Sequence, residues 1–341
     1  MRSKFAFVIS ALTLFAAGAA SADEITVVSG GGVLQDAHRE AFWKPTAAKL
    51  GITVNEATSA AGLQDVRVQV QSNAVTWDLI DMGSNECAIA AKEGLLEPLD
   101  YSVINTDGID KAMVDKYWVG IFYFSTIMSW NKETVKGEPK TWADFFDTKN
   151  FPGERGIYNY PLGTLEMALL ADGVEPSKLY PLDVERAFKK LEQLKPSVSV
   201  WWDSGAQSAQ LAKDGAVDML QVWNGRLAGA LKDGAKFGYT FNQGILQADC
   251  YAIPKGAPHK ELAMKALALF VSPEQQANFT KYIPYGPVNS KAFDTGIITP
   301  EAAKLINSSP ENAKNQIIAD SNWWGENGAK VVEMWDNFRQ K

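Results

Sequence analysis

Residues 217–254 read VDMLQVWNGRLAGALKDGAKFGYTFNQGILQADCYAIP and contain two apolar, strand-like runs that each end in polar residues. The first run (219–222) leads into Trp223-Asn224-Gly225-Arg226, and the second (244–248) leads into Asp249. If both strand ends open on one cleft, an indole face, a fixed cation and a fixed anion meet there. A small ligand with charges of both signs needs that combination for recognition, whereas no particular reaction needs it. These residues therefore predict a binding site.

The first 22 residues have the pattern of a secretory signal peptide. Arg2 and Lys4 precede an apolar run over residues 5–17, and Ala20-Ser21-Ala22 is a small-x-small cleavage pattern. The apolar run is shorter than the ~20 residues of a membrane-spanning helix, and no Cys stands at the cleavage site for lipidation. We expect a mature protein that begins at Asp23, is not embedded in a membrane, and is located in a bacterial periplasm.

The size and charge of the mature chain favour a two-lobed protein with a small ligand. About 320 residues remain after cleavage, which exceeds the ~250–300 residues that one hydrophobic core usually serves. The net charge is -7, and no basic run or patch is present to neutralise phosphates, so nucleic acid is not an expected partner. This charge is compatible with a cationic or zwitterionic solute.

Strand and helix patterns alternate in the first part of the mature chain. The runs 25–28, 52–54 and 77–80 are strand-like, and apolar residues recur at helical spacing between them. The first run stops at Ser29-Gly30-Gly31-Gly32, and the third leads into Gly83-Ser84-Asn85-Glu86, which has the composition of a helix cap. The βαβαβ order predicts an α/β fold with a mainly parallel sheet and helices on both faces.

Residues 117–130 form an aromatic and β-branched run that is too long for an ordinary strand. We expect this run to leave one lobe and enter the other. Beyond it, Thr141 and Asp144 have the spacing of a capping box, with Asp in place of the usual Glu. Further amphipathic helices are predicted over residues 165–171, 184–194 and 261–271, and a tryptophan-rich tail over 317–339.

The two cysteines and two histidines do not form a recognisable metal motif. Cys87 and Cys250 are far from His38 and His259 in sequence, so we expect neither a metal site nor a cofactor. An oxidising compartment permits a disulfide between the cysteines. The sequence leaves both the bridged and the free state open, because it does not give the separation of their Cα atoms. His38 is expected to be a solvated helix residue.

In their order along the chain, these features resemble the spermidine/putrescine-type family of periplasmic solute-binding proteins of ABC importers. The resemblance is carried by VWNG at 222–225, DCYAIP at 249–254, YIPYGPVN at 282–289 and TWADFF at 141–146, and it covers essentially the whole mature chain. Among the members, the chain is most similar to the branch that binds γ-aminobutyrate (GABA).

The resemblance implies a two-lobed type II binding-protein fold with a hinge and a central cleft. Lobe 1 would comprise residues 23–127 and 250–288, and lobe 2 residues 128–249 and 289–341. Crossovers are expected near 124–128, 250–253 and 287–290. The implied partners are the membrane permease subunits of an ABC transporter, and the implied oligomeric state is a monomer.

The resemblance also implies roles for particular residues. In polyamine binders a Trp in the VWNG segment lies along the alkyl chain of the ligand, an Asp before the AIP strand binds an ammonium group, and a Tyr near YGPVN lines the cleft. In this sequence these residues are Trp223, Asp249 and Tyr285. Trp202, Gly31 and Gly83 complete the candidate ligand-binding residues, with one member of the Trp201-Trp202 pair expected in the core.

Departures from the polyamine pattern indicate a different ligand. Residues 157–163 contain no acid for a second amine, Gln247 replaces an aromatic residue, and Arg226 stands where polyamine binders have a small neutral residue. Arg226 would clamp a carboxylate, Asp249 would hold an amine, and Trp223 would cover the methylenes between them. A short ω-amino acid, GABA or a close relative, fits this arrangement.

Other interpretations remain open at this point. Arg226 is also explained as a surface residue that opens a helix, Asp249 as a turn or cap residue, and Trp223 as core. The alternative ligands are putrescine or another polyamine, a neutral amino acid, or an opine-like compound. An alternative of a different class is a secreted carbohydrate-active enzyme, although the sequence contains neither GxSxG nor HExxH. The chain is therefore expected not to be an enzyme.

Overall fold

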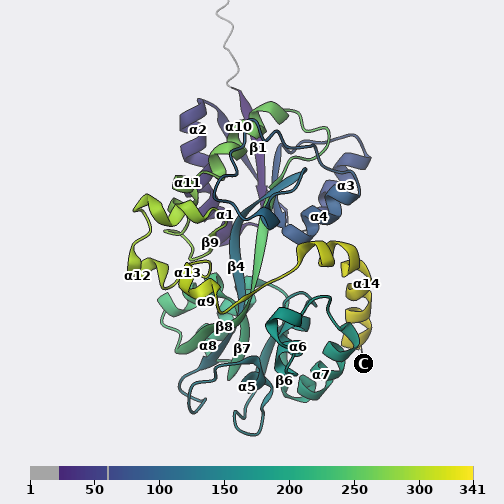
Figure 1. Cartoon of the computed structure of the whole chain (residues 1–341), viewed down its shortest axis with the longest axis vertical. Helices are drawn as coiled ribbons and strands as arrows, with labels where there is room; N and C mark the ends of the chain where they lie inside the picture. Colours follow the sequence, from purple (N-terminus) through teal and green to yellow (C-terminus); the bar gives the residue numbers. More distant parts are fainter. Residues whose placement is uncertain (1–22, 60, 341) are drawn as a thin grey trace, which may run out of the picture.

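The protein is an elongated, two-lobed α/β structure in which one sheet runs through both lobes (Figure 1). The computed structural model describes residues 23–59 and 61–340. The signal peptide expected over residues 1–22 lies outside the described residues. The strand order is β2-β1-β3-β8-β4-β7-β5-β6, and the two short strands β9 and β10 pair at the sides of β4 and β8. The two-lobed α/β fold expected from the sequence is confirmed.

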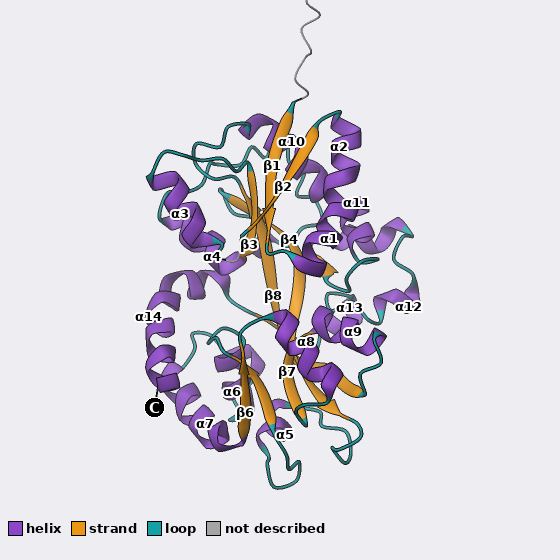
Figure 2. Cartoon of the chain, turned by 180° about the vertical axis from the view of Figure 1, so that it is seen from behind, coloured by secondary structure: helices purple, strands orange, loops and turns teal. Residues whose placement is uncertain are grey.

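Three parallel strands and their flanking helices build the first lobe. Strand β1 pairs in parallel with both β2 and β3, as the βαβαβ pattern predicts, and Figure 2 shows helices on both sides of these strands. The elements are β1 (Glu24–Ser29), α1 (Gly32–His38), a π-helical segment (Arg39–Trp43), α2 (Lys44–Leu50), β2 (Thr53–Thr58), α3 (Leu63–Gln71), β3 (Leu79–Gly83), α4 (Ser84–Lys92), α10 (Lys260–Phe270) and α11 (Pro273–Phe279).

The second lobe repeats this arrangement with another parallel set, in which β5 pairs with both β6 and β7. Its elements are α5 (Trp142–Phe146), β5 (Arg155–Tyr158), α6 (Thr164–Ala171), α7 (Val184–Leu194), β6 (Val198–Trp202), α8 (Gly205–Asp214), β7 (Met219–Trp223) and α9 (Asn224–Lys232). The backbone N–H of Thr141 donates to the Asp144 carboxylate at 3.0 Å, so the predicted capping box is present at the start of α5.

Two long antiparallel strands, β4 (Trp118–Asn131) and β8 (Phe237–Ala252), connect the lobes (Figure 2). The end of β8 pairs with β3, and the second half of β4 pairs with β7. Each strand therefore starts in one lobe and ends in the other. The sheet is parallel within each outer set and antiparallel at this central junction, because a strand that crosses between the lobes pairs with one that crosses in the opposite direction.

A third segment, residues 307–318, also runs between the lobes and is held by a polar cluster at β4. The hydroxyl of Ser125 in β4 donates to Gln316 at 2.6 Å and accepts from Asn307 at 2.9 Å. Strand β10 (Ile317–Ile318) then pairs with β8, and helix α14 (Ser321–Gln340) completes the chain. The remaining short elements are 3-10 turns at Lys111–Met113, Pro176–Lys178, Lys195–Ser197 and Ser290–Thr295, strand β9 (Gly286–Pro287), and helices α12 (Pro300–Ala303) and α13 (Pro310–Ala313).

The lobe boundaries drawn from the sequence remain a prediction. The side-chain amide of Asn289 donates to the backbone carbonyl of Val271 at 3.2 Å, and Asn289 forms an isolated antiparallel β-bridge with Ile109. The segment around Asn289 therefore packs on the first lobe. We propose that the third crossover lies within residues 307–318 rather than near 287–290. We propose that the other two crossings lie near the middle of β4 and the middle of β8. The first is close to the expected 124–128, whereas the second precedes the expected 250–253, which form the end of β8 and pair with β3.

Each lobe has its own hydrophobic core. One cluster of buried residues surrounds Phe42, Phe122 and Phe279 in the first lobe, with Phe42 stacked on Phe279 at 5.0 Å. Another surrounds Trp142 and Trp335 in the second lobe. Two cores are the expected outcome for a chain of this length, because one core rarely serves more than ~250–300 residues.

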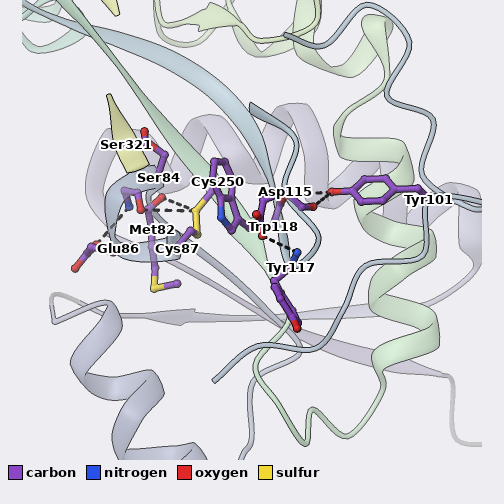
Figure 3. Close-up of a disulfide and its surroundings, with 11 residues drawn as sticks. Met82, Ser84, Glu86, Cys87, Tyr101, Asp115, Tyr117, Trp118, Cys250 and Ser321 are labelled. Atoms are coloured by element: carbon purple, nitrogen blue, oxygen red, sulfur yellow. Dashed lines mark hydrogen bonds between the residues drawn. A yellow bond between two sulfur atoms is a disulfide. The ribbon is translucent and has the colours of Figure 1, made fainter. Parts of the chain in front are cut away.

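Cys87 in α4 and Cys250 in β8 form a disulfide (Figure 3). Both residues are fully buried, and 163 positions separate them in sequence. Closing so long a loop in the unfolded chain contributes on the order of 4–5 kcal/mol in the chain-entropy model. The bond also fixes the start of α4 against the end of β8. None of the described helices combines the length and apolar character needed to cross a bilayer.

Candidate functional site

A cavity of about 430 Å³ lies where the strand ends of the two lobes meet. Gly83 ends β3, Tyr158 ends β5 and Trp223 ends β7, and helices α4 and α9 begin directly after two of these strands. Ligands of open α/β sheets bind at the carboxyl ends of the strands. The lining residues are Leu34, Gly83, Asn85, Glu86, Phe124, Tyr158, Tyr160, Leu162, Trp223, Arg226, Gln247, Asp249 and Tyr285.

Aromatic rings form one wall of the cavity. Trp223 meets Phe124 edge-on at 5.8 Å and Tyr158 edge-on at 5.1 Å, and Tyr285 lies 5.9 Å from Phe124. Because the faces and edges of these rings fix one another, the wall keeps its shape without a ligand. Such a wall suits the methylene groups of a small solute and the face of an ammonium group.

Trp202 lies behind this wall and does not line the cavity. Its side chain is fully buried, stacks on Tyr158 at 4.5 Å and meets Trp223 at 90°. Its indole N–H donates to the carbonyl of Gln221 at 2.9 Å. Trp201 packs instead against Trp335. Neither member of the pair therefore reaches the cavity, and Trp202 supports the rings that do.

Arg226 supplies a positive charge to the cavity from the first turn of α9. Its Nε atom is buried and has no hydrogen-bond partner. Within residues 23–59 and 61–340, no ion pair includes this guanidinium. Burial raises the pKa of the neighbouring Tyr285 to about 12, although the charge of Arg226 acts in the opposite direction. A guanidinium that forms no ion pair is available to a ligand carboxylate.

Asp249 supplies the negative charge, and Glu86 lies near it. Burial raises the pKa of Asp249 to about 7, and the charge of Glu86 adds to this effect. Burial also raises the pKa of Glu86, while the backbone N–H groups of Gly83 and Leu63 lower it. The Gly83 N–H donates to the Glu86 carboxylate at 3.3 Å. Backbone N–H groups at the start of α4 (Gly83) and of α3 (Leu63) thus partly satisfy Glu86, whereas Asp249 forms no ion pair within the described residues.

A third acid lies on the same face of the sheet. Asp81 pairs with Tyr251 and Gly83 pairs with Asp249 across β3 and β8, which makes Asp81 and Asp249 diagonal neighbours. Burial raises the pKa of Asp81 well above its ordinary range, and the charge of Asp249 raises it further. Its carboxylate accepts from Ser29 at 3.5 Å. The surroundings of Asp249 are thus rich in carboxylates, so a ligand ammonium group is the complementary partner.

Two glycines were expected at the site, and they differ in placement. Gly83 lines the cavity at the end of β3. Gly31 does not line it. The backbone of Gly31 has a φ of 75°, which favours glycine, and a Cβ there would lie 3.0 Å from the methyl group of Thr58. Gly31 therefore serves the turn before α1, and Leu34 is the residue of α1 that reaches the cavity.

His38 is fully buried, which corrects the expectation of a solvated residue. It packs among aromatic rings, with Phe279 at 5.3 Å and Phe122 at 5.6 Å. Its Nδ1 lies 2.9 Å from the hydroxyl of Tyr251, and burial lowers the pKa of the imidazole to about 3, so the ring is neutral. Its place four residues before the buried Phe42 on the same helical face was the sequence signal for this environment.

Several lining residues were not expected from the sequence. Tyr158 and Tyr160 belong to a stretch that differs from the polyamine pattern, and Phe124 belongs to the crossover run. Glu86 was interpreted as a cap residue, and that role is present together with its position at the cavity. The signal that could have identified Tyr158 and Tyr160 is their place at and just after the end of a strand, and Glu86 similarly follows the end of β3. Phe124 lies in the middle of β4, where no such signal exists. No group of three or more potential metal ligands occurs in the described part of the chain.

The fold and cavity define a solute-binding protein: two lobes joined by two long strands and one further segment, and a site at the facing strand ends. The sequence model of the bacterial extracellular solute-binding proteins matches residues 41–309, so the chain belongs to this family. Members of the family bind solutes and are not enzymes. The protein is the substrate-binding component of an ABC transporter, which works with membrane permease subunits.

Individual relatives extend over nearly the whole chain. The GABA-binding protein of Pseudomonas aeruginosa is 32% identical over 98% of this chain and 97% of its own length. Among solved structures, an ABC transporter substrate-binding protein from Bradyrhizobium japonicum is 45% identical with a TM-score of 0.90, covering 93% of this chain and 99% of that one. The Atu4243-GABA receptor is 37% identical (TM-score 0.86; 93% and 98%). MotA from A. tumefaciens B6, in complex with glucopine, is 41% identical (TM-score 0.86; 93% and 99%).

Proposed function

We propose that the protein captures a small zwitterion with an ammonium group at one end and a carboxylate at the other, with GABA as the first candidate. The observation that supports this most is that Arg226 and Asp249 line one cavity together with Trp223, and neither charge is neutralised by an ion pair within the described residues. Two relatives named for GABA, the binding protein of P. aeruginosa and the Atu4243 receptor, support the same class of solute.

Each of the three residues has a separate role in this proposal. Arg226 binds the carboxylate through its guanidinium, Asp249 accepts hydrogen bonds from the ammonium group, and Trp223 covers the methylenes. A hydrogen bond to a charged group contributes roughly 1.5–3 kcal/mol, and a desolvated cation over an indole about 2 kcal/mol. Together these contributions are comparable to the about -8.2 kcal/mol of a micromolar complex in a preformed pocket.

The protein acts in the periplasm according to this proposal. Residues 1–22 direct export and are removed after Ala22, and the mature protein is a monomer. Ligand that contacts both lobes favours the closed form, because only that form allows all the contacts at once. The permease subunits of an importer then bind the closed protein. The family's extracellular character supports this location.

An opine-like solute, a conjugate of an amino acid and a sugar, is the second candidate. The cavity of about 430 Å³ has room for more than a four-carbon chain. Asn85, Tyr160 and Gln247 add groups that can bind hydroxyls at its lining, and Gln247 already donates to Thr126 at 2.7 Å. The glucopine complex of a 41% identical relative supports this candidate. A polyamine is disfavoured, since Arg226 repels a second ammonium group.

Isothermal titration of the protein beginning at Asp23 tests the proposal, with GABA, glucopine and putrescine as separate ligands. The proposal expects stoichiometric binding of GABA and no signal with putrescine. In Arg226→Ala the affinity for GABA falls about 100-fold, the equivalent of roughly 2.7 kcal/mol. Binding of glucopine alone would favour the second candidate. Binding of putrescine alone, or GABA affinity unchanged in Arg226→Ala, would overturn the zwitterion proposal.

A further inference from the structure

Gly205 is the first residue of helix α8 and lies outside the cavity lining. Ser204 caps the helix by accepting a hydrogen bond from the backbone N–H of Gln207 at 3.2 Å. The φ of Gly205 lies outside the positive region, so its backbone conformation is open to any residue. The conformation of the chain therefore does not explain why this buried position carries a glycine.

The side chain of Arg226 provides the explanation. A Cβ atom on residue 205 would lie 2.4 Å from Nε of Arg226 and 3.0 Å from its Cδ and Cγ. A separation under 3 Å between nonbonded heavy atoms of this kind is well inside van der Waals contact. The arginine stem thus occupies the space that a side chain on residue 205 would fill. The first turn of α8 is the surface on which Arg226 rests.

This contact also accounts for the unusual state of the guanidinium. Its Nε is buried without a hydrogen-bond partner. A buried, unpaired donor costs about 1–3 kcal/mol. The protein accepts this cost because packing against α8 holds the arginine in one position. Helix α8, which carries Gly205, packs against α9, which carries Arg226. Both helices belong to the second lobe, so the contact is present in the open and closed forms alike.

We propose that Gly205 is a positioning residue for Arg226, and that the missing Cβ places the guanidinium where it binds the carboxylate of the ligand. This inference rests on the proposed function for the identity of the ligand. Gly205 itself contacts no ligand. It determines specificity indirectly, because displacement of the guanidinium removes the carboxylate seat and leaves the ammonium seat at Asp249 intact.

Alanine at position 205 separates this role from a purely structural one. Alanine is a better helix former than glycine by about 1 kcal/mol, so a structural glycine would tolerate the change with unchanged or higher stability and unchanged binding. Gly229 in α9 is the matched control. It is an exposed helical glycine with open space around its Cβ position and an ordinary φ.

The test compares Gly205→Ala, Gly229→Ala and Arg226→Ala by titration with GABA and by crystal structures without ligand. We expect Gly205→Ala to lose at least tenfold in GABA affinity with no loss of melting temperature, and its guanidinium to move by about 1 Å or more, a displacement large enough to impair binding. Gly229→Ala should match the wild type in both measurements. Adding Gly205→Ala to Arg226→Ala should cause no further loss, because the first change acts through the arginine.

The outcomes distinguish the two proposals. Unchanged GABA affinity in Gly205→Ala, or an unmoved guanidinium in its crystal structure, would overturn the positioning role. If the wild type binds no ω-amino acid, the proposed ligand fails, and the ligand-free crystal structure still decides whether residue 205 sets the position of Arg226.

Discussion

Burial, together with the charge of Glu86, sets the charge state of Asp249. The residue is partly buried at the cavity wall, lies near Glu86 and Asp81, and forms no ion pair within the described residues. Across the site, the Nε atom of Arg226 is buried without a hydrogen-bond partner. Burial and Glu86 disfavour the ionised form of Asp249 in the empty protein, and a ligand ammonium group would offset this cost. Function and stability therefore oppose each other at these two residues.

The first prediction concerns pH. Burial and Glu86 raise the pKa of Asp249 to about 7, so below this pH the residue is neutral and must lose a proton before it binds an ammonium group. We expect GABA affinity to fall up to tenfold per pH unit below 7 and to level off above it. Titration from pH 5.5 to 8.5 measures this dependence. Affinity that is constant over the range would contradict the assignment of Asp249.

The same group predicts an effect on stability. In the unfolded chain Asp249 ionises near its ordinary pKa of about 4, and in the folded protein near 7. The folded state is the one that holds the proton between these values, so stability is lost as pH rises from 4 to 7. Asp249→Asn removes the charge and should raise the unfolding free energy at pH 8 by about 1–3 kcal/mol, while weakening GABA binding. Chemical denaturation at pH 5 and 8 provides the comparison, with little difference expected at pH 5.

Individual site residues could be predicted only where a residue type and a strand end coincide. Trp223 ends β7, Arg226 follows it in the first turn of α9, and Asp249 lies opposite the end of β3, and all three line the cavity. Trp202 ends β6 as well, yet its ring turns into the core beneath Tyr158. Side-chain direction at the end of a strand alternates with each residue, and the sequence alone did not determine which member of the Trp201-Trp202 pair faces which side.

At the scale of elements, periodicity predicted the helices well and the long strands only in part. The expected helix over 184–194 coincides with α7, and the crossover run over 117–130 differs from β4 by one residue at each end. Strand β8 begins seven residues before the expected run at 244–248. Glycine, Asn242 and Gln243 interrupt its apolar pattern, and Gln243 has a positive φ of 57°. Pairing with β4 overrides these local preferences.

The disulfide gives a prediction at this scale. It joins α4 and β8, the elements that carry Glu86 and Asp249. We expect reduction to lower the melting temperature by about 7 °C, from on the order of 4–5 kcal/mol of lost stabilisation spread over a protein of this size. Calorimetry with and without a phosphine reductant measures the shift. A Cys87→Ala/Cys250→Ala variant is the control and should not respond to the reductant. An equal melting temperature in both conditions for the wild type would contradict a stabilising role.

At the scale of the whole molecule, two lobes with separate cores, joined only by β4, β8 and one further segment, are expected to move relative to each other. The chain length predicted two lobes, and the order of segments placed residues 289–341 with the second lobe, whereas we propose that residues 289–306 belong to the first. That placement depends on side chains such as Asn289 and Asn307, which bond to residues distant in sequence. Long-range polar contacts of this kind leave no periodic signal, so the third crossover could not be located from the sequence.

Closure on ligand binding is the prediction for the whole molecule. We expect the radius of gyration from small-angle scattering to decrease when saturating GABA is added to the protein, because the ligand contacts residues of both lobes. Arg226→Ala at the same GABA concentration should remain in the extended form. A radius that does not change while titration shows full occupancy would rule out closure as the response to the ligand.

The most direct measurement of the central claim is the affinity for GABA and for putrescine, in parallel, of the protein that begins at Asp23. The account predicts stoichiometric binding of GABA, no binding of putrescine, and about 100-fold weaker GABA binding in Arg226→Ala. Putrescine binding without GABA binding would show that Arg226 does not serve a ligand carboxylate, and it would contradict the zwitterion site formed by Arg226, Asp249 and Trp223.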